Sequence, residues 1–111
     1  MVFFRSNEDV DHDLAIAKIA DDAPGPEATR AGLYHIAYEM GSLDEVKEAY
    51  RLVQEMGVTV AGYGDHGDTK GLYILDPDGI EIELYAVAPE YQQIPLEEIL
   101  AQTAGLTTQA G

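Results

Sequence analysis

The stretch Lys70–Tyr85, KGLYILDPDGIEIELY, predicts two strands joined by a tight turn. Residues 72–75 form an apolar run, and residues 80–85 alternate apolar and polar side chains, as half-buried strands do. Between them, residues 76–79 (DPDG) suit a type I turn, with Asp first, Pro second and Gly fourth. The alternation places Glu81, Glu83 and Tyr85 on the face opposite the apolar residues. That face is either a solvated acidic surface or the wall of a site.

Upstream of this hairpin, the pattern predicts a strand, a helix and another strand. Residues 32–40 (GLYHIAYEM) alternate, which places His35 and Glu39 on one face. Seven apolar residues then recur at helical spacing: Leu43, Val46, Ala49, Tyr50, Leu52, Val53 and Met56. Ser42 with Glu45 forms a capping-box pattern, and Gly57 suits the end of the helix. Residues 58–63 predict a strand, with residues 64–68 as a loop. Residues 31–88 therefore predict a β-α-β-β-β module.

The two ends of the chain frame this module within a single predicted domain, 1–111. Residues 2–4 and 12–19 predict a β-hairpin, which a Pro/Gly/acid-rich connector at 21–30 separates from the module. The hairpin, residues 2–19, could be the end of a preceding module of the same kind. Residues 89–111 form a C-terminal tail, in which Pro95 and the following residues predict a short amphipathic helix. The last residues, 106–111, are expected to be frayed.

Composition excludes several classes of function. Six basic against 21 acidic residues give a formal net charge of −15, which argues against nucleic acid and against anionic membrane surfaces as partners. No apolar run reaches the roughly 18 residues of a membrane span. The chain has no cysteine, so it has neither disulfides nor thiolate metal ligands. No secretory signal is visible, and a cytoplasmic protein is expected.

The three histidines each have an ordinary explanation when taken singly. His12 begins a strand between two aspartates, where a surface histidine is common. His35 lies in an alternating strand, where a partly buried, hydrogen-bonded histidine is usual. His66 lies in a Gly/Asp loop and is expected to be exposed.

Taken in order along the chain, these residues resemble a known family. The β-α-β-β-β unit with DHDLAIA around His12, GLYHIAYEM around His35, GDHG around His66 and YILDPDGIEIELY with Tyr73 and Glu83 is similar to the vicinal oxygen chelate superfamily. That superfamily includes glyoxalase I, bleomycin-resistance proteins and type I extradiol (catechol-cleaving) dioxygenases. The resemblance covers roughly residues 2–87 and is closest to the C-terminal half of the extradiol dioxygenases.

The resemblance implies a role for each residue. His35 and Glu83 match metal ligands, His12 matches the acid–base histidine, and His66 and Tyr73 match residues of the substrate pocket. A divalent metal is implied, with Fe(II) as the first expectation and Zn, Ni, Co or Mn as alternatives. Two histidines and one carboxylate leave positions open on such a metal for a chelating diol and O₂. The implied substrate is a small, catechol-like molecule.

The chain departs from the family in one respect, because the first metal histidine would lie upstream of His12 and no fourth histidine exists. A homodimer or a separate complementing module is therefore expected to complete the site. Three alternatives stay open: a degenerate, inactive dioxygenase, a glyoxalase-like isomerase or lyase with a metal site shared between two chains, and a metal-free binding module of the bleomycin-resistance kind. The predicted fold class is α+β: one βαβββ module with a preceding hairpin and a short C-terminal helix, paired into a dimer.

Overall fold

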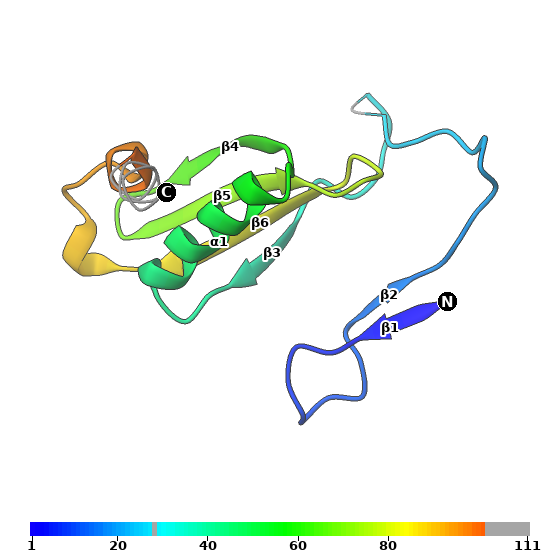
Figure 1. Cartoon of the computed structure of the whole chain (residues 1–111), viewed down its shortest axis with the longest axis horizontal. Coiled ribbons are helices and arrows are strands. Elements are labelled where there is room, and N and C mark those ends of the chain that lie inside the picture. Colours follow the sequence, from blue (N-terminus) through cyan, green and yellow to red (C-terminus); the bar gives the residue numbers. More distant parts are fainter. Residues whose placement is uncertain (28, 102–111) are drawn as a thin grey trace.

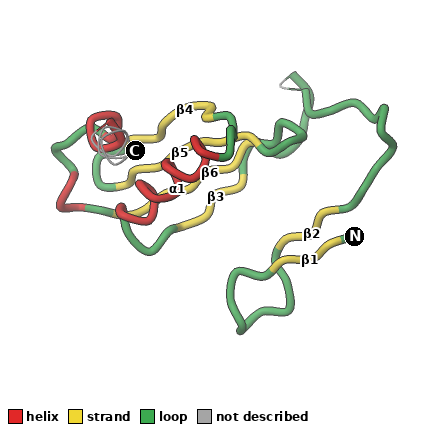
Figure 2. Tube along the Cα trace, viewed as in Figure 1, coloured by secondary structure: helices red, strands yellow, loops and turns green. Residues whose placement is uncertain are grey.

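A computed structural model describes residues 1–27 and 29–101 of the chain, and its main body is a four-stranded sheet with one helix packed on one face (Figures 1 and 2). The elements of this body are β3 (Ile36–Glu39), α1 (Leu43–Glu55), β4 (Val60–Asp65), β5 (Thr69–Leu75) and β6 (Glu81–Val87). The strand order is β3-β6-β5-β4. Strand β3 runs parallel to β6, and the other two pairs are antiparallel. The predicted α+β fold with a βαβββ module is confirmed.

The turn between β5 and β6 closes as its sequence predicts. The N–H of Gly79 donates to the carbonyl of Asp76 at 3.0 Å, which is the hydrogen bond of a four-residue β-turn. The side chain of Asp76 accepts two further backbone hydrogen bonds, from Asp78 at 2.9 Å and from Ile80 at 2.8 Å. Gly79 has a φ of 87°, a conformation that costs a glycine little. The turn thereby sets the pairing of β5 with β6.

Helix α1 begins at its predicted cap. The hydroxyl of Ser42 accepts a hydrogen bond from the N–H of Glu45 at 3.3 Å, and the Glu45 carboxylate accepts one from the N–H of Gly41 at 2.7 Å. The return bond of the capping box therefore goes one residue further upstream than in the usual motif. Gly57 follows the helix with a φ of 71°, as predicted for its end.

The predicted apolar face of α1 was too wide. Leu43, Val46 and Val53 are buried against the sheet, whereas Leu52 and Met56 are exposed. At about 100° per residue, Leu52 lies half a turn around the helix from Leu43, so the two cannot share one narrow contact face. The buried side of the sheet contributes Leu72 and Ala86 to the same core.

The C-terminal segment completes the core on the helix side of the sheet. After a short 3₁₀ helix, η1 (Pro89–Tyr91), residues 96–101 are helical and bury Leu96, Ile99 and Leu100. The amphipathic helix predicted after Pro95 is therefore present. The residues predicted to be frayed, 106–111, lie outside the described part of the chain. No helix in the described residues is long and apolar enough to cross a membrane.

Several predicted strand boundaries were wrong, and two of them concern the candidate site. Strand β3 begins at Ile36, so His35 and the residues before it precede the strand instead of lying in it. Strand β4 continues through Gly64 and Asp65, which the composition had indicated as loop. These two residues pair with Gly71 and Lys70 of β5, and cross-strand pairing extends a strand through residues of low β-propensity.

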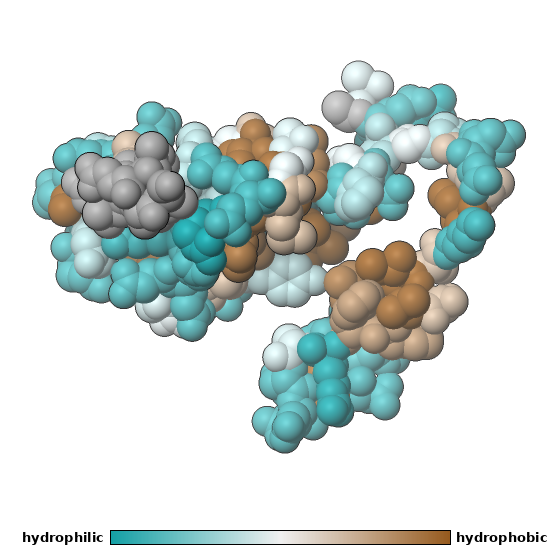
Figure 3. All heavy atoms as spheres, in the orientation of Figure 1, coloured by the Kyte–Doolittle hydropathy of each residue, from teal (hydrophilic) through white to brown (hydrophobic). Residues whose placement is uncertain are grey.

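The N-terminal hairpin stands apart from the module in Figure 1. Its strands, β1 (Val2–Phe4) and β2 (Leu14–Ile16), form a two-stranded sheet of their own. The second strand is shorter than the predicted 12–19. Val2, Phe3, Phe4 and Ile16 are exposed, and Figure 3 shows a hydrophobic surface over this hairpin. An isolated two-stranded hairpin is marginally stable in water, and this one leaves its apolar side chains exposed.

Candidate metal centre

The sheet face opposite α1 brings the predicted site residues of three strands together. Strand register places Ala37 of β3 and Tyr73 of β5 on either side of Glu83 in β6. Paired residues point to the same face of a sheet, so all three lie on the face that α1 does not cover. His35, two residues before Ala37, lies diagonally across from Glu83 on that face.

His35 and Glu83 approach each other closely enough to act as a pair. The Nε2 atom of His35 lies 3.7 Å from Oε1 of Glu83, and the two side chains are 24% and 12% exposed. The other ring nitrogen of His35, Nδ1, is buried and has no hydrogen-bond partner among the described residues.

Tyr73 is the third member of this cluster. Its ring packs edge-on against the ring of His35, with centroids 5.5 Å apart. Burial raises the pKa of the Tyr73 hydroxyl, and its hydrogen bond to the negatively charged Glu83 raises the pKa further. The phenol is therefore protonated at neutral pH, and its hydroxyl can donate a hydrogen bond to the Glu83 carboxylate.

The donor set fits half of a divalent metal site. Two ligands of one ion with bonds of about 2.1 Å lie about 3.0–3.4 Å apart, close to the observed 3.7 Å between Nε2 and Oε1. One imidazole and one carboxylate suit first-row divalent metals such as iron, cobalt, nickel and zinc. Within residues 1–27 and 29–101, however, no group of three or more His, Cys, Asp or Glu side chains is placed to hold a metal ion. A metal ion held by this pair would therefore need further ligands from outside these residues.

The structure does not bring His12 and His66 to this pair within one chain. His12 lies in the hairpin, where its Nδ1 is 2.7 Å from the carboxylate of Asp11 and its ring packs against Phe3. His66 is exposed in the turn between β4 and β5, and only its backbone N–H is fixed, by a 2.9 Å bond to the carbonyl of Thr69. Both residues keep their predicted roles only as proposals for an assembled protein.

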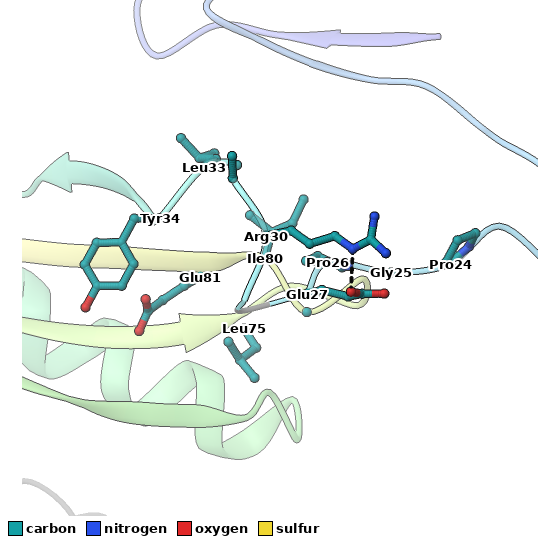
Figure 4. Close-up of a pocket in the computed structure, with 13 residues that line it drawn as sticks. Pro24, Gly25, Pro26, Glu27, Arg30, Leu33, Tyr34, Leu75, Ile80 and Glu81 are labelled. Atoms are coloured by element: carbon teal, nitrogen blue, oxygen red, sulfur yellow. Dashed lines mark hydrogen bonds and ion pairs between the residues drawn. The ribbon is translucent and has the colours of Figure 1, made fainter.

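A cavity of about 940 Å³ adjoins this face at the N-terminal end of β3 (Figure 4). The segment before β3 lines one side with Arg30 and Leu33, and the β5–β6 hairpin lines the other with Leu75 and Ile80. Tyr34, which also lines the cavity, packs against the ring of His35 with centroids 4.8 Å apart. The cavity thus lies next to the His35–Glu83 pair without including either residue.

Sequence reasoning missed Tyr34 and the glycines that surround Glu83. Gly64 and Gly71 lie on the same sheet face as Glu83, and both are close to its carboxylate. The available signal was glycine inside an otherwise good strand pattern, which often marks a close approach of another group to the backbone.

Fold and site together define a class of protein: a βαβββ module whose open sheet face carries a histidine–carboxylate pair. A sequence profile of the Glyoxalase/Bleomycin resistance protein/Dioxygenase superfamily matches residues 1–84, and the chain belongs to this superfamily. The matched range includes both the hairpin and nearly all of the module. The resemblance seen in the sequence is confirmed.

Individual relatives support the same assignment. Over 64 residues, the chain is 41% identical to a protein named catechol-2,3-dioxygenase from Bacillus subtilis (strain 168). A glyoxalase/dioxygenase from Nostoc punctiforme is similar in structure, with a TM-score of 0.50 at 27% identity over 63% of this chain and 47% of that one. A Bacillus halodurans protein assigned to the glyoxalases has the same fold, with a TM-score of 0.53 at 22% identity over 60% of this chain and 53% of that one.

This chain matches only part of each of these relatives. The alignment with the Bacillus subtilis protein covers 58% of this chain but only 22% of that protein. The chain also spans about half of each of the two solved structures. The shared fold is therefore shown for one module.

Proposed function

We propose that this chain is a metal-dependent protein of the extradiol-dioxygenase kind, which binds a divalent metal through His35 and Glu83 for ring cleavage of a catechol-like substrate with O₂. The observation that carries the proposal is the pair itself. Nε2 of His35 lies 3.7 Å from Oε1 of Glu83 on an open sheet face. The identity of 41% with the protein named catechol-2,3-dioxygenase supports this reaction class.

Each residue of the cluster has a distinct task in this proposal. His35 and Glu83 would hold the divalent metal, Fe(II) in the first instance, which would supply Lewis acidity toward a diol substrate. Glu83 contributes negative charge that offsets the charge of the ion. Tyr73 keeps its proton at neutral pH, because its pKa is raised, and its hydroxyl would donate a hydrogen bond that orients the Glu83 carboxylate. The cavity beside Tyr34 lies where an apolar part of a substrate could extend.

The proposal includes a second polypeptide, because two protein donors do not complete such a site. A second copy of this chain, or a separate module, covers the open sheet face and the exposed apolar hairpin. The hairpin would act as the end of a preceding module, and His12 would reach an assembled site as its acid–base group. His66 would line the substrate pocket from the β4–β5 turn.

A second function follows from the same incomplete site. Two chains related by a two-fold axis would bring together two imidazoles and two carboxylates from the His35–Glu83 pairs. This set of four donors favours a glyoxalase-like, metal-dependent isomerase or lyase that needs no O₂. The observation in its favour is that the described residues of one chain supply two candidate ligands and no cluster of three.

Metal content and oxygen dependence test both functions. The purified chain, reconstituted with Fe²⁺, Co²⁺, Ni²⁺ or Zn²⁺ and desalted, is analysed for metal per chain and for molar mass by light scattering. Ring cleavage of simple catechols is followed by absorbance with and without O₂. The dioxygenase proposal expects Fe²⁺ binding and O₂-dependent cleavage, whereas one ion per two chains with O₂-independent activity on hemithioacetals supports the glyoxalase-like alternative.

Substitutions assign the ligands. His35→Ala and Glu83→Gln are each expected to remove bound metal. Glu39→Gln is the matched control, because Glu39 is a carboxylate on the same sheet that accepts a 3.2 Å hydrogen bond from Tyr85 and belongs to no predicted site. Metal retained at wild-type level in both His35→Ala and Glu83→Gln would refute the assignment. Wild-type protein that binds none of the four metals would refute both enzymatic functions and leave the metal-free binding module.

A further inference from the structure

The carboxylate of Glu83 lies over positions in two neighbouring strands that have no side chain. A Cβ atom at Gly71 of β5 would lie 2.8 Å from Oε2 of Glu83, and one at Gly64 of β4 would lie 3.1 Å from the same oxygen. The Gly64 position would also lie 3.1 Å from the hydroxyl and from a ring carbon of Tyr73. The point where Glu83 and Tyr73 meet is therefore the space that a side chain at Gly64 would fill.

Neither glycine is required by its backbone. Among the described glycines, only Gly57, Gly67 and Gly79 have positive φ. Alanine at position 64 or 71 would therefore cause no backbone strain, so the presence of glycine there has another reason. Gly62 makes the comparison direct. It lies two residues before Gly64 in the same strand and pairs with Tyr73, yet a Cβ at Gly62 would have no atom within 4 Å. What distinguishes Gly64 is the pair of side chains above it.

We propose that Gly64 and Gly71 are positioning residues for the candidate metal ligand: their missing side chains form a recess that holds the Glu83 carboxylate against the Tyr73 hydroxyl, with its other oxygen directed toward His35. This inference rests on the proposed metal-binding role of Glu83. A side chain in the recess displaces Oε2 and the phenol together. Because both oxygens belong to one planar carboxylate, displacement of Oε2 also moves Oε1 relative to Nε2 of His35.

The test compares Gly64→Ala with Gly62→Ala. At position 64, the nearest atoms are the ends of two side chains, which can shift by a few tenths of an ångström while the strand keeps its place. Gly71→Ala is the less suitable variant, because its Cβ would also lie 2.9 Å from Cβ of Tyr85, which is fixed to the neighbouring strand. Thermal unfolding and molar mass establish that both variants fold and assemble as the wild type does.

The first measurement is Co²⁺ affinity by calorimetry. Groups that orient a metal ligand typically change affinity by roughly 10- to 100-fold when altered. Gly64→Ala is expected to weaken Co²⁺ binding by about this factor, and Gly62→Ala is expected to leave it unchanged. Equal affinity in the two folded variants would overturn the proposal.

The second measurement needs no metal, so it separates this inference from the proposed function. The ring of Tyr73 is followed at neutral pH by NMR of ¹³C-labelled tyrosine, with Tyr73→Phe identifying its signal among the seven tyrosines. Gly64→Ala is expected to change the chemical shift of that signal, because the added Cβ displaces the Tyr73 hydroxyl, whereas Gly62→Ala leaves it unchanged. If the wild type binds no Co²⁺ but this difference is found, the recess stands and the metal role fails. An unchanged Tyr73 in Gly64→Ala refutes the recess.

Discussion

The ion pair between Lys70 and Asp65 gives the sharpest prediction about stability. Nζ of Lys70 lies 2.8 Å from Oδ1 of Asp65, and the two side chains are 1% and 32% exposed. Oδ2 of Asp65 accepts a hydrogen bond from the N–H of Leu96 at 2.8 Å, which ties the C-terminal helix to the β4–β5 hairpin. Asp65→Asn keeps an oxygen for that bond but removes the charge that balances a buried ammonium.

The magnitude follows from this geometry. Removing one partner of a buried ion pair costs about 3–5 kcal/mol, and the partial exposure of Asp65 lowers this to about 2–4 kcal/mol. For a domain of this size, the loss corresponds to a decrease in Tm of about 10–20 °C. The pKa of Asp65 gives a consistent figure. The hydrogen bond from Lys70, and then that from Leu96, lower the pKa from 3.8 to about 2, which is equivalent to about 2 kcal/mol.

The pH dependence has a definite sign. Because the pKa of Asp65 is lower in the folded than in the unfolded state, its contribution is complete above about pH 3.8 and is lost as the pH falls toward about 2. The difference in free energy of unfolding between wild type and Asp65→Asn is therefore expected to be full at pH 7. It should narrow steadily between those two pH values. Urea denaturation followed by circular dichroism at several pH values measures it.

Two control variants isolate the buried charge. Glu27→Gln removes a carboxylate from an exposed ion pair, with Nε of Arg30 at 2.7 Å, and is expected to cost less than about 1 kcal/mol. Lys70→Met in the Asp65→Asn background removes the unbalanced charge and is expected to recover much of the loss. The reasoning is refuted if Asp65→Asn costs no more than Glu27→Gln, or if the double variant is less stable than Asp65→Asn alone.

Two further predictions concern the core and the helix cap. Leu72 is fully buried in β5, between β4 and β6, and its change to Ala is expected to lower the free energy of unfolding by about 2–5 kcal/mol. The change of the exposed Leu33 to Ala is expected to alter that free energy little. Similar losses for the two variants would contradict the observed core. Ser42→Ala is expected to lower the free energy of unfolding by about 0.5–2 kcal/mol, because the N–H of Glu45 loses its acceptor. Ser42→Asn should retain most of the stability, because its side chain can also cap the helix. If chemical denaturation shows that the Asn variant is as unstable as the Ala variant, capping is excluded as the cause.

Both proposed functions depend on a second polypeptide that covers the open face of the sheet. The module buries one face of its sheet under α1 and the C-terminal helix, whereas His35, Glu83 and Tyr73 lie on the other face. The exposed hairpin presents a second apolar surface. Both surfaces are consistent with a chain that works in an assembly, and both would be covered by one two-fold contact between copies or by a complementing module.

Much of the fold could be predicted from local patterns along the chain. Ser42 and Gly57 delimit the helix, Asp76 and Gly79 make the turn, and alternation along β6 assigns Glu83 to the face away from the core. These features depend on backbone geometry over a few residues, which is why short-range sequence signals suffice. Histidine and glutamate at positions 35 and 83 could likewise be named as a pair by family resemblance.

Tertiary structure alone decided which of these residues meet. The distance between His35 and Glu83 depends on the parallel pairing of β3 with β6, a contact across 48 positions that no local pattern specifies. The pairing of β4 with β5 extends β4 through Gly64, so that a glycine expected in a loop instead lies close to Glu83. The burial of Lys70 against Asp65 likewise depends on the C-terminal helix returning to the sheet. Sequence by itself determined the elements and their faces, because these are set by neighbours along the chain; the register that brings the faces into contact is set by packing between distant segments.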